Sequence, residues 1–540
     1  MTAPAHPAAD PATRRGGPPL IPRPSQLTTL PGRFTLDAHT AIRAEAAATP
    51  AADLLRTLLA PATGLPLPPA ADGSVVLVVD PALTGLGREG YGLTVGADAV
   101  LLRAAHPDGL LNAVQTIRQL LPPEALSAEP VRGTEWTLPC VQITDVPRFA
   151  WRGVMLDVAR RFRPVSFLRR FVDLLALHKL NVLHLHLTDD QGWRMPVAAY
   201  PRLTTVGGEP HGGAYTRGEL EDLVAYAAAR GITVVPEIEM PGHVRAALAA
   251  YPELGNDPSR RLEVWNRWGV CDTILGVHDE VLDFCRAVLD EVADVFPSPY
   301  VHVGGEECPI VEWERSDDAR RRAAREGLNG PGELHRWFMD RIGGFLAERG
   351  RTPLGWTESG RDLPLAFTAL PWRDAAHGLV AAGRGQDIIM APHRSTYLDY
   401  PQSGRPEEPP GQPGGPVTLR DVYDLDPAPA GWEAATAARV LGTQAQLWSE
   451  YVPTAAHAEY LAFPRLCALA ETAWSAHRDW PGFQRRLAHH RTRLDTLGVP
   501  DRPPHHPHDQ QNPRDPHHPH DQHGPHHSPH IPPPGEESGR

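Results

Sequence analysis

The sequence has 540 residues, of which 41% are hydrophobic and 22% are charged, so the chain can bury a large core and exceeds the usual size of one domain. The formal net charge of −13 leaves no basic stripe to displace counterions from phosphates, which argues against nucleic acid or an anionic membrane as the main partner. Five scattered cysteines exclude a disulfide scaffold, and we expect free buried thiols, with a Cys271–Cys285 pair as the alternative.

The chain begins with a Pro- and Ala-rich segment, residues 1–20, for which we predict disorder. This segment lacks the apolar run, roughly 7–15 residues long, of a signal peptide. No stretch of the sequence reaches the ~20 apolar residues of a membrane span. We therefore expect a cytoplasmic protein, with secretion as the alternative.

Residues 21–147 carry the pattern of a smaller α+β domain. Short apolar runs predict a strand over residues 74–79 and a pair of strands within 91–105, and apolar positions at helical spacing predict an amphipathic helix over 109–121. We expect the helix to cover one face of the sheet.

From residue 148 to residue 497, short apolar strands alternate with longer helical stretches, which is typical of a parallel α/β fold. The first helices are predicted over residues 167–180, 218–230 and 278–296. The predicted fold class is therefore α/β, a (β/α)8 TIM barrel preceded by the smaller α+β domain. The barrel strands are predicted over residues 153–158, 181–189, 233–239, 300–307, 352–356, 369–373, 387–392 and 440–448.

Residues 498–540 form a His- and Pro-rich segment of low complexity, which we predict to be a disordered, solvated tail. Its histidines could hold Zn²⁺ or Ni²⁺ loosely.

Polar and aromatic residues gather at the predicted C-terminal strand ends, where barrel enzymes carry their functional groups. Each residue alone has a structural explanation, such as core filling by Trp. So many at one mouth favour a carbohydrate site, because sugar faces stack on indole rings and sugar hydroxyls bond to charged groups. These residues are Asp157, Arg160, Thr188, Asp189, Asp190, Glu237, Glu239, His243, Glu306, Glu307, Trp356, Trp372, Trp448 and Glu450.

The sharpest local motif is HVGGEE, residues 302–307. Its glycines let the backbone approach a ligand, and its adjacent carboxylates repel each other, which raises the pKa of at least one of them. A carboxylic acid that stays protonated near neutral pH is what a leaving glycosidic oxygen requires. The same acidic pair would also fit a magnesium site or a helix N-terminal cap.

Residues 20–495 resemble glycoside hydrolase family 20, the β-N-acetylhexosaminidases. The motifs that carry the resemblance are RGVMLDVARRF (152–162), HKLNVLHLHLTDDQGWR (178–194), YPRLTTVGG (200–208), VVPEIEMPGH (234–243), HVGGEE (302–307), LGW (354–356), TYLDY (396–400) and LWSEY (447–451). In the smaller domain, EGYGLTV (89–95) and GLLNAVQTIRQLL (109–121) resemble the α+β domain that precedes the barrel in this family.

The resemblance implies an exo-acting glycoside hydrolase that removes terminal non-reducing β-linked GlcNAc or GalNAc, with retention, from glycans or chitooligosaccharides. The family is an exception to the two-carboxylate rule, because the substrate's own 2-acetamido oxygen attacks the anomeric carbon and an oxazolinium ion forms. No cofactor or metal is needed.

By the same resemblance, Glu307 would be the general acid and then the general base, and Glu306 would orient the acetamide and stabilise the cationic intermediate. Asp189 and His243 would adjust the proton affinity of Glu307. The substrate-binding residues would be Arg160, Asp399 and Glu450 for the sugar hydroxyls, Trp356, Trp372 and Trp448 for the acetamide pocket, and Tyr397 for the acetamide carbonyl.

Two positions depart from the family pattern. Glu306 stands where Asp is usual, and its extra methylene moves the carboxylate about 1 Å further into a tight pocket, which can cost on the order of 10²-fold in rate. Arg161 stands where many members have His, which we expect to alter only the rim. Reduced or re-tuned activity is therefore expected.

Three alternatives remain. The first is a catalytically weakened, amino-sugar-binding relative with Glu306 as the lesion. The second is a metal-dependent hydrolase that uses His184 and His186, which face the same way on a strand; structural histidines in the barrel wall are the simpler interpretation. The third is a glycosidase with an enzyme nucleophile, which needs two carboxyl groups ~5 Å apart across the sugar, and adjacent Glu306 and Glu307 fit this poorly.

Overall fold

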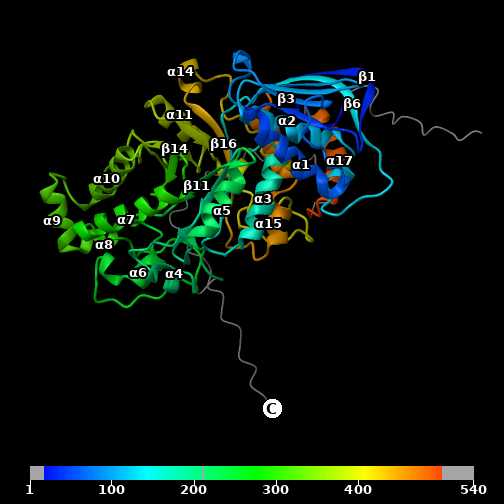
Figure 1. Ribbon diagram of the computed structural model, residues 1–540. Coiled ribbons are helices and arrows are strands. Elements are labelled where there is room, and N and C mark those ends of the chain that lie inside the picture. Colours follow the sequence, from blue (N-terminus) through cyan, green and yellow to red (C-terminus); the bar gives the residue numbers. More distant parts are fainter. Residues whose placement is uncertain (1–16, 210–211, 501–540) are drawn as a thin grey trace, which may run out of the picture.

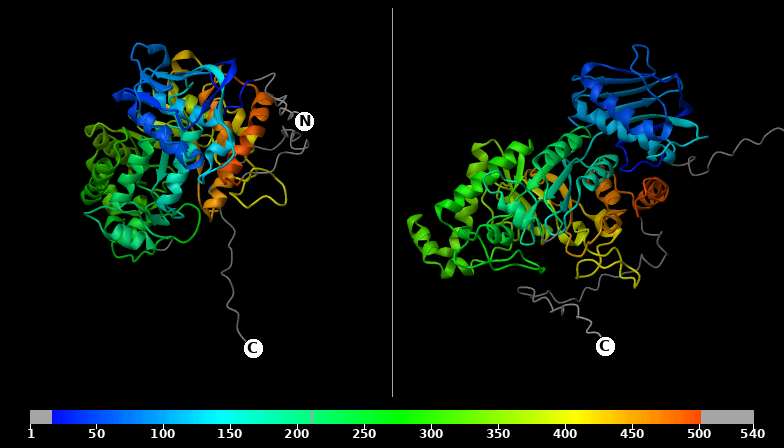
Figure 2. Two further views of the ribbon diagram at one scale, coloured as in Figure 1. Left: turned by 45° about the vertical axis from the view of Figure 1, so that its right-hand side comes forward. Right: turned by 60° about the horizontal axis from the view of Figure 1, so that its bottom comes forward.

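The computed structural model describes residues 17–209 and 212–500. A smaller N-terminal domain lies beside a larger barrel, and the last helix packs near their junction (Figures 1 and 2). Disorder was predicted for residues 1–20 and 498–540, and most of both segments lies outside the described residues. The described ends are packed, since Leu20 is 2% and Val499 is 3% exposed. The prediction of disorder was therefore too broad for residues 17–20 and 498–500.

The smaller domain is a six-stranded mixed sheet in the order β1-β6-β4-β5-β3-β2, covered by helices α1 and α2. The predicted strands and helix are present as β3, β4, β5 and α2. The edge strand β1 was not predicted, because it is mostly exposed and lacks an apolar alternation. The elements are β1 Gln26–Leu36, β2 Ile42–Ala44, α1 Thr49–Thr63, β3 Val75–Val79, β4 Tyr91–Val95, β5 Val100–Ala104, α2 Pro107–Leu120 and β6 Trp136–Asp145.

Helix α2 connects the two domains. Pro107 occupies its first turn, where no N–H is needed, and the His106 ring accepts a hydrogen bond from the N–H of Asp108 (3.3 Å). Near the other end, Gln119 Nε2 donates to the carbonyls of Ile21 (2.6 Å) and Leu177 (2.8 Å). Leu177 ends the first barrel helix, α3 (Val165–Leu177), so the smaller domain is bonded directly to the barrel wall.

A buried ion pair also crosses the junction. Lys179 Nζ donates to Asp145 Oδ2 (2.9 Å) and to the Tyr91 hydroxyl (2.7 Å), while Trp474 Nε1 donates to Asp145 Oδ1 (2.8 Å). All four side chains are buried. Removing either charge alone would leave the other one buried without a counter-ion, which is strongly destabilising, so the pair constrains how the two domains meet.

Parallel strands close into a barrel in the order β7-β8-β11-β12-β13-β14-β15-β16, with β16 paired to β7. The predicted TIM barrel is confirmed, and every predicted barrel strand is present. The strands are β7 Trp151–Asp157, β8 Val182–His186, β11 Thr233–Glu237, β12 Tyr300–His302, β13 Thr352–Thr357, β14 Thr368–Pro371, β15 Ile388–Met390 and β16 Val440–Leu447.

Helices cover the outside of the barrel (Figure 1). The three predicted helices are present as α3, α5 and α7, whereas residues 358–367 connect β13 to β14 without a helix. The other elements of this domain are β9 Thr188–Asp189, β10 Gly192–Trp193, α4 Arg202–Gly207, α5 Arg217–Ala228, α6 Arg245–Ala250, α7 Asp279–Val295, α8 Val311–Arg315, α9 Asp317–Arg325, α10 Leu334–Glu348, α11 Ala375–Gly383, α12 His393–Thr396, α13 Leu419–Asp424, α14 Ala434–Ala437, α15 Ala455–Ala462, α16 Arg465–Trp474 and α17 Trp480–Thr496.

Several strands end earlier than predicted, and three of them, β8, β11 and β12, end before acidic residues that the prediction placed in them. β12 stops at His302 because Gly304 and Gly305 have φ angles of 62° and 94°, which cannot continue an extended strand. β8 and β11 end at His186 and Glu237. The predicted strand bounds at residues 189, 239 and 307 were therefore wrong, and the acidic residues there lie beyond the barrel strands.

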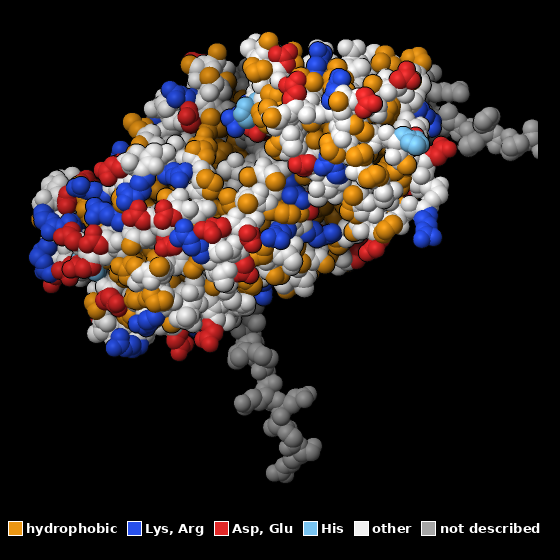
Figure 3. All heavy atoms as spheres, in the orientation of Figure 1, with side chains coloured by type: hydrophobic (Ala, Val, Ile, Leu, Met, Phe, Trp, Pro, Cys, Tyr) orange, Lys and Arg blue, Asp and Glu red, His pale blue; other side chains and the backbone are white. Residues whose placement is uncertain are grey.

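All five cysteines are free thiols, so the alternative of a Cys271–Cys285 disulfide was wrong. In the part of the chain that the structure describes, no helix is long and apolar enough to cross a membrane. Charged side chains of both signs intermingle over the face shown in Figure 3.

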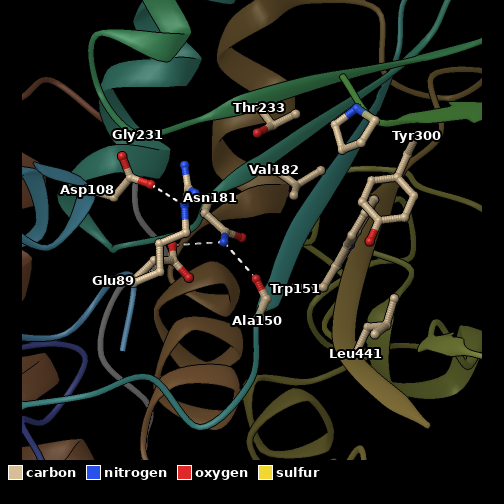
Figure 4. A pocket seen from close by; sticks show the side chains of 12 residues that line it. Glu89, Asp108, Ala150, Trp151, Asn181, Val182, Gly231, Thr233, Tyr300 and Leu441 are labelled. Carbon is tan, nitrogen blue, oxygen red and sulfur yellow. Dashed lines mark hydrogen bonds and ion pairs between the residues drawn. The ribbon is translucent and has the colours of Figure 1, made fainter. Parts of the chain in front are cut away.

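A cavity of about 250 Å³ opens at the N-terminal ends of the strands, where the barrel meets the smaller domain (Figure 4). Trp151, Val182 and Tyr300, which begin three strands, line it. Glu89 lies at its edge but is held by Arg152 NH2 at 2.6 Å. This end of a TIM barrel serves stability, and the predicted site residues lie at the opposite end.

Candidate active site

The C-terminal end of β7 turns sharply and directs Arg160 into the barrel mouth. Asp157 Oδ1 accepts hydrogen bonds from the backbone N–H groups two and three residues later, both at 3.0 Å, and Oδ2 accepts one from the N–H of Ser449 (2.9 Å), just past β16. The carboxylate thus closes the turn and ties two strand ends together. Arg160 then reaches Asp189 (NH2 to Oδ2, 2.8 Å) and Glu450 (Nε to Oε1, 3.6 Å).

A chain of charged groups begins at the centre of the barrel. The strand register aligns Glu237 with His186 on one side and with His302 on the other, so these side chains share one face of the sheet. His186 Nδ1 lies 2.6 Å from Glu237 Oε2, and His186 Nε2 lies 2.8 Å from Asp189 Oδ2. Trp356 Nε1 donates to Glu237 Oε1 (2.7 Å). Glu237 thereby supports both Asp189 and Trp356.

His243 connects this chain to the acidic motif. Its Nδ1 lies 3.3 Å from Asp189 Oδ1 and from Asp190 Oδ2, and its Nε2 lies 3.8 Å from Glu307 Oε2. Burial opposes a charge on His243, but the two carboxylates outweigh it and raise the pKa of His243 well above its ordinary value. Burial likewise opposes a charge on Asp189, yet Arg160 and His243 hold the pKa of Asp189 well below its usual range. An imidazolium therefore faces Glu307 at neutral pH.

The glycines of HVGGEE form a turn that side chains would block. A Cβ on Gly304 would lie 1.7 Å from Glu239 Oε2, and a Cβ on Gly305 would lie 2.5 Å from the Cε of Met339. Glu307, two residues after Gly305, also has a positive φ, of 45°. That conformation costs a non-glycine residue on the order of 1–3 kcal/mol, and such strain clusters at functional sites.

The side chains of Glu306 and Glu307, which follow this turn, lie in different environments. Glu306 is buried, and burial raises its pKa to about 8. The side chain of Glu307 is 32% exposed. One raised pKa in this pair was predicted, but burial is its main cause and repulsion by Glu307 is minor. Burial, and then the neighbouring Glu306, also raise the pKa of Glu239 well above its ordinary value.

Aromatic rings form a wall at this mouth, and the charge of Glu306 acts on one of them, Tyr397. Ring centroids are 5.9 Å apart for Trp356 and Trp448, 6.2 Å for Tyr397 and Trp448, and 6.3 Å for Trp372 and Tyr397. Trp356 is 1% exposed and forms the floor, while Trp372 and Trp448 are half-buried. Such a wall accepts an apolar sugar face or a methyl group.

Four of the predicted site residues each carry one buried polar atom without a hydrogen-bond partner among the described residues. These atoms are Glu306 Oε2, Trp372 Nε1, His243 Nε2 and Asp399 Oδ1. Burial, and then the charge of Glu450, raise the pKa of Asp399 well above its usual range. Because buried polar groups are normally paired, these atoms fit a polar ligand that supplies both donors and acceptors.

Histidines of the barrel wall also have the spacing of metal ligands, in the group His184, Glu237 and His302. Burial lowers the pKa of His184 to about 4, and its Nε2 lies 3.2 Å from Glu237 Oε2. Both oxygens of Glu237 already accept from His186 and Trp356. Charge contacts with the one buried carboxylate of Glu237 therefore explain why these histidines lie together, and the absence of a metal stays a prediction.

The predicted site residues all lie at this barrel mouth and are linked by the contacts described here. Arg161 donates to the backbone carbonyls of Ser449 and Glu450, both at 3.2 Å, which fits the rim position expected for it. The predicted site residues are Arg160, Asp189, His243, Glu306, Glu307, Trp356, Trp372, Tyr397, Asp399, Trp448 and Glu450.

Sequence reasoning missed three contributors. His186 was considered only as a metal ligand or as a structural residue of the barrel wall, although its place in β8 beside the strand-end Asp189 was a signal. Arg373 and Glu358 follow two of the predicted tryptophans in sequence, and Arg373 NH2 lies 3.8 Å from Glu307 Oε1. No local pattern distinguishes such a pair from an ordinary surface ion pair.

Two family models match the chain, "Glycosyl hydrolase family 20, catalytic domain" over residues 149–477 and "Glycosyl hydrolase family 20, domain 2" over residues 17–146. A β-hexosaminidase of Porphyromonas gingivalis is 39% identical over 499 residues, and the match spans 89% of this chain but 64% of that protein. A β-hexosaminidase of Akkermansia muciniphila is 38% identical over 435 residues, 77% of this chain and 85% of that one. The crystal structure of a family 20 exo-β-N-acetylglucosaminidase from Vibrio harveyi, in complex with N-acetylglucosamine, has a TM-score of 0.81 and 31% identity, with 90% of this chain and 78% of that chain covered.

Proposed function

The chain belongs to glycosyl hydrolase family 20, and we propose that its barrel mouth is the active site of an exo-acting β-N-acetylhexosaminidase. The enzyme removes terminal non-reducing β-linked GlcNAc or GalNAc with retention, through the substrate-assisted mechanism of its family. Relatives that match most of the chain are β-hexosaminidases, and nothing in these matches favours the alternative of a weakened sugar-binding relative. We propose glycans and chitooligosaccharides that end in these sugars as substrates.

The observation that carries the proposal is the position of Glu306 beside the aromatic wall. Glu306 Oε2 and Trp372 Nε1 are buried without a partner among the described residues. The ring of Tyr397 lies 6.3 Å from that of Trp372 and 6.2 Å from that of Trp448, and the charge of Glu306 acts on the Tyr397 hydroxyl. An acetamide offers an N–H to Glu306 and an apolar methyl group to the indoles. A 2-hydroxyl group offers no such methyl, so the pocket suits 2-acetamido sugars.

Arg160, Asp399 and Glu450 supply the other side of the pocket. Arg160 is 8% exposed and its guanidinium lies 4.9 Å from the Trp448 ring centroid. Glu450 lies 3.6 Å from Arg160, and Asp399 Oδ1 is unpartnered among the described residues. Charged groups of both signs can bond the O3, O4 and O6 hydroxyls of one sugar. Because these groups are buried, they bind the terminal sugar and favour exo action.

In the first half-reaction, the acetamide oxygen bonds to the anomeric carbon while the bond from that carbon to the leaving oxygen breaks. Glu307 gives its proton to the leaving oxygen, a contribution of about 10²–10⁴-fold. The Glu306 carboxylate stabilises the positive charge that develops on the oxazolinium ring. A nearby cation disfavours protonation of Glu306. The positively charged oxazolinium ion therefore favours the ionised carboxylate of Glu306, and this carboxylate in turn stabilises the oxazolinium ion.

In the second half-reaction, Glu307 takes a proton from water as the water oxygen bonds to the anomeric carbon. The bond to the acetamide oxygen breaks, and the two inversions together retain the configuration. Between the two halves Glu307 is ionised, and the His243 imidazolium, 3.8 Å away, favours that form. Asp189 keeps His243 protonated and oriented for this role.

The proposal is tested with p-nitrophenyl β-GlcNAc, the wild-type protein and two variants. We expect turnover by the wild type, inhibition by a thiazoline analogue of the oxazolinium ion, and a loss of kcat of at least about 10² in Glu307→Gln. Glu348→Gln, at the exposed end of α10, is the matched control and should keep full activity. Turnover of p-nitrophenyl β-glucoside at a similar rate, insensitive to the thiazoline, would show that the acetamide is not the nucleophile.

A further inference from the structure

The general acid lies between two cations of different character. His243 Nε2 is 3.8 Å from Glu307 Oε2, and Arg373 NH2 is 3.8 Å from Glu307 Oε1. The His243 side chain is 4% exposed, whereas that of Arg373 is 48% exposed. One side of the carboxylate therefore faces the protein interior, and the other faces a cation open to solvent.

Arg373 is itself restrained from two sides. Its guanidinium lies 4.4 Å from the ring centroid of Trp372, and its Nε donates to Glu358 Oε1 (2.8 Å). The backbone N–H of Glu358 donates to Asp362 Oδ2 (2.9 Å), which fixes the loop between β13 and β14. A stacked and paired guanidinium has little freedom, so Arg373 keeps its place beside Glu307.

We propose that Arg373 is a positioning residue for the general acid and base Glu307, and that Glu358 limits how strongly Arg373 attracts it. This inference rests on the proposed function. The two residues extend the interior chain of Asp189 and His243 outward to the rim, so that charges alternate on both sides of Glu307.

The effect on the reaction follows from Coulomb attraction. A cation beside Glu307 favours its ionised form, which eases proton release to the leaving oxygen and holds the carboxylate in place for the attack of water. The same attraction works against keeping the proton that the first half-reaction donates, so removal of Arg373 should extend that half-reaction to higher pH. Exposed ion pairs of this kind are weak, and their strength corresponds to a shift of about 0.2–0.7 pH unit.

Other charged and titratable groups also face this pair. Glu307 is faced by Glu306 from its own loop, by His243 after β11, and by Tyr397 at the end of α12. Arg373 is faced by Glu358 and by His393. Of the groups other than Glu307, only Glu358 loses an ion-pair partner when Arg373 is replaced, and the Glu358→Gln variant reports on that residue separately.

The test compares kcat/KM against pH for the wild type and the variants Arg373→Gln, Glu358→Gln and Arg373→Lys. The substrates are N,N′-diacetylchitobiose, whose poor leaving group needs the acid, and 2,4-dinitrophenyl β-GlcNAc, whose good one does not. With chitobiose, the midpoint of the basic side of the kcat/KM profile should move to higher pH by about 0.2–0.7 unit in Arg373→Gln. It should move to lower pH by a similar amount in Glu358→Gln. Arg373→Lys, which keeps the charge, should restore most of the wild-type profile.

Arg361→Gln removes an exposed arginine from the same loop as Glu358 and should leave the profile unchanged. High salt should shrink the difference between wild type and Arg373→Gln, because the pair is exposed. The inference would be overturned if the basic side of the pH profile had the same midpoint in wild type, Arg373→Gln and Glu358→Gln. A loss of rate in Arg373→Gln that is equal at every pH, with no shift of the midpoint, would overturn it as well. An inactive wild type would instead count against the proposed function.

Discussion

The imidazole Nε2 of His243 lies 3.8 Å from Oε2 of Glu307, so a buried cation adjoins the group that we assign as general acid. The other ring nitrogen lies 3.3 Å from Asp189 Oδ1. Because Asp189 raises the pKa of His243, the charge that Glu307 meets depends on a residue that it does not touch.

Asp189→Asn tests this dependence. The amide keeps the size of the carboxylate but removes the charge that favours the imidazolium, so His243 becomes neutral at a lower pH. We expect kcat/KM at neutral pH to fall by about 10²–10³, the usual cost of losing one preorganised charge. Asp190→Asn, which also faces His243, should cost less because Asp190 lacks the contact of Asp189 with Arg160. Wild-type kinetics in Asp189→Asn would contradict this role.

Glu306→Asp tests the departure from the family pattern. Removing one methylene draws the carboxylate back by about 1 Å, towards the position that Asp occupies in the family, and positional errors of that size can cost about 10² in rate. We therefore expect kcat for p-nitrophenyl β-GlcNAc to rise several-fold, up to about 10²-fold. Glu306→Gln keeps the length but not the charge, and its kcat should fall. A lower kcat in both variants would mean that the pocket has adapted to Glu.

Gly304→Ala tests the turn that carries the acidic pair. The added Cβ would meet Glu239 Oε2 at 1.7 Å, at a φ of 62° that side chains rarely adopt. We expect a loss of at least about 2 kcal/mol in the free energy of unfolding, measured in urea, together with most of the activity. Gly344→Ala on the exposed face of α10 has open space and should add about 0.5–1 kcal/mol. Equal stability of the two variants would exclude a packed, left-handed turn.

Two buried histidines outside the site predict a loss of stability in acid. His178 Nε2 lies 2.9 Å from His490 Nε2, and His178 Nδ1 donates to the carbonyl of Leu174 (2.7 Å). Burial lowers the pKa of His178 to about 4 and that of His490 well below its ordinary value. In the unfolded chain a histidine titrates near pH ~6.5. As the pH falls from about 6.5 towards 4, the unfolded chain binds protons that the folded one excludes, so stability falls.

For His178 alone, the loss between about pH 7.5 and pH 5 is roughly 2 kcal/mol. Urea unfolding of His178→Asn should therefore show a smaller drop over that interval than the wild type. His186 and His243 have raised pKa values and act in the opposite direction, but they are common to both proteins and leave the difference unchanged. His39→Asn, at an exposed position, is the control. If the free energy of unfolding of His178→Asn fell with pH as steeply as that of His39→Asn, the prediction would be refuted.

The sequence by itself determined the barrel and the residues at its mouth. Apolar periodicity is a local property, so the strands around Val154 and Val235 and the helix of Leu223 could be recognised without knowledge of their neighbours. Polar residues that follow such strands, Asp189 and Glu307 among them, must meet at one end of a parallel barrel. The family motifs then supplied the reaction, because several long motifs occur in the right order.

Tertiary structure alone decided the strand ends, the charges and the connections. β12 stops at His302 because the following turn packs Gly304 against Glu239, a contact between separate loops. His186 and Glu237 are 51 positions apart and meet only through strand register. Burial, which has no sequence signature, sets the pKa of Glu306, and barrel closure alone brings the rim residue Arg373 beside Glu307. These features depend on long-range packing and solvent exclusion, which exist only once the chain has folded.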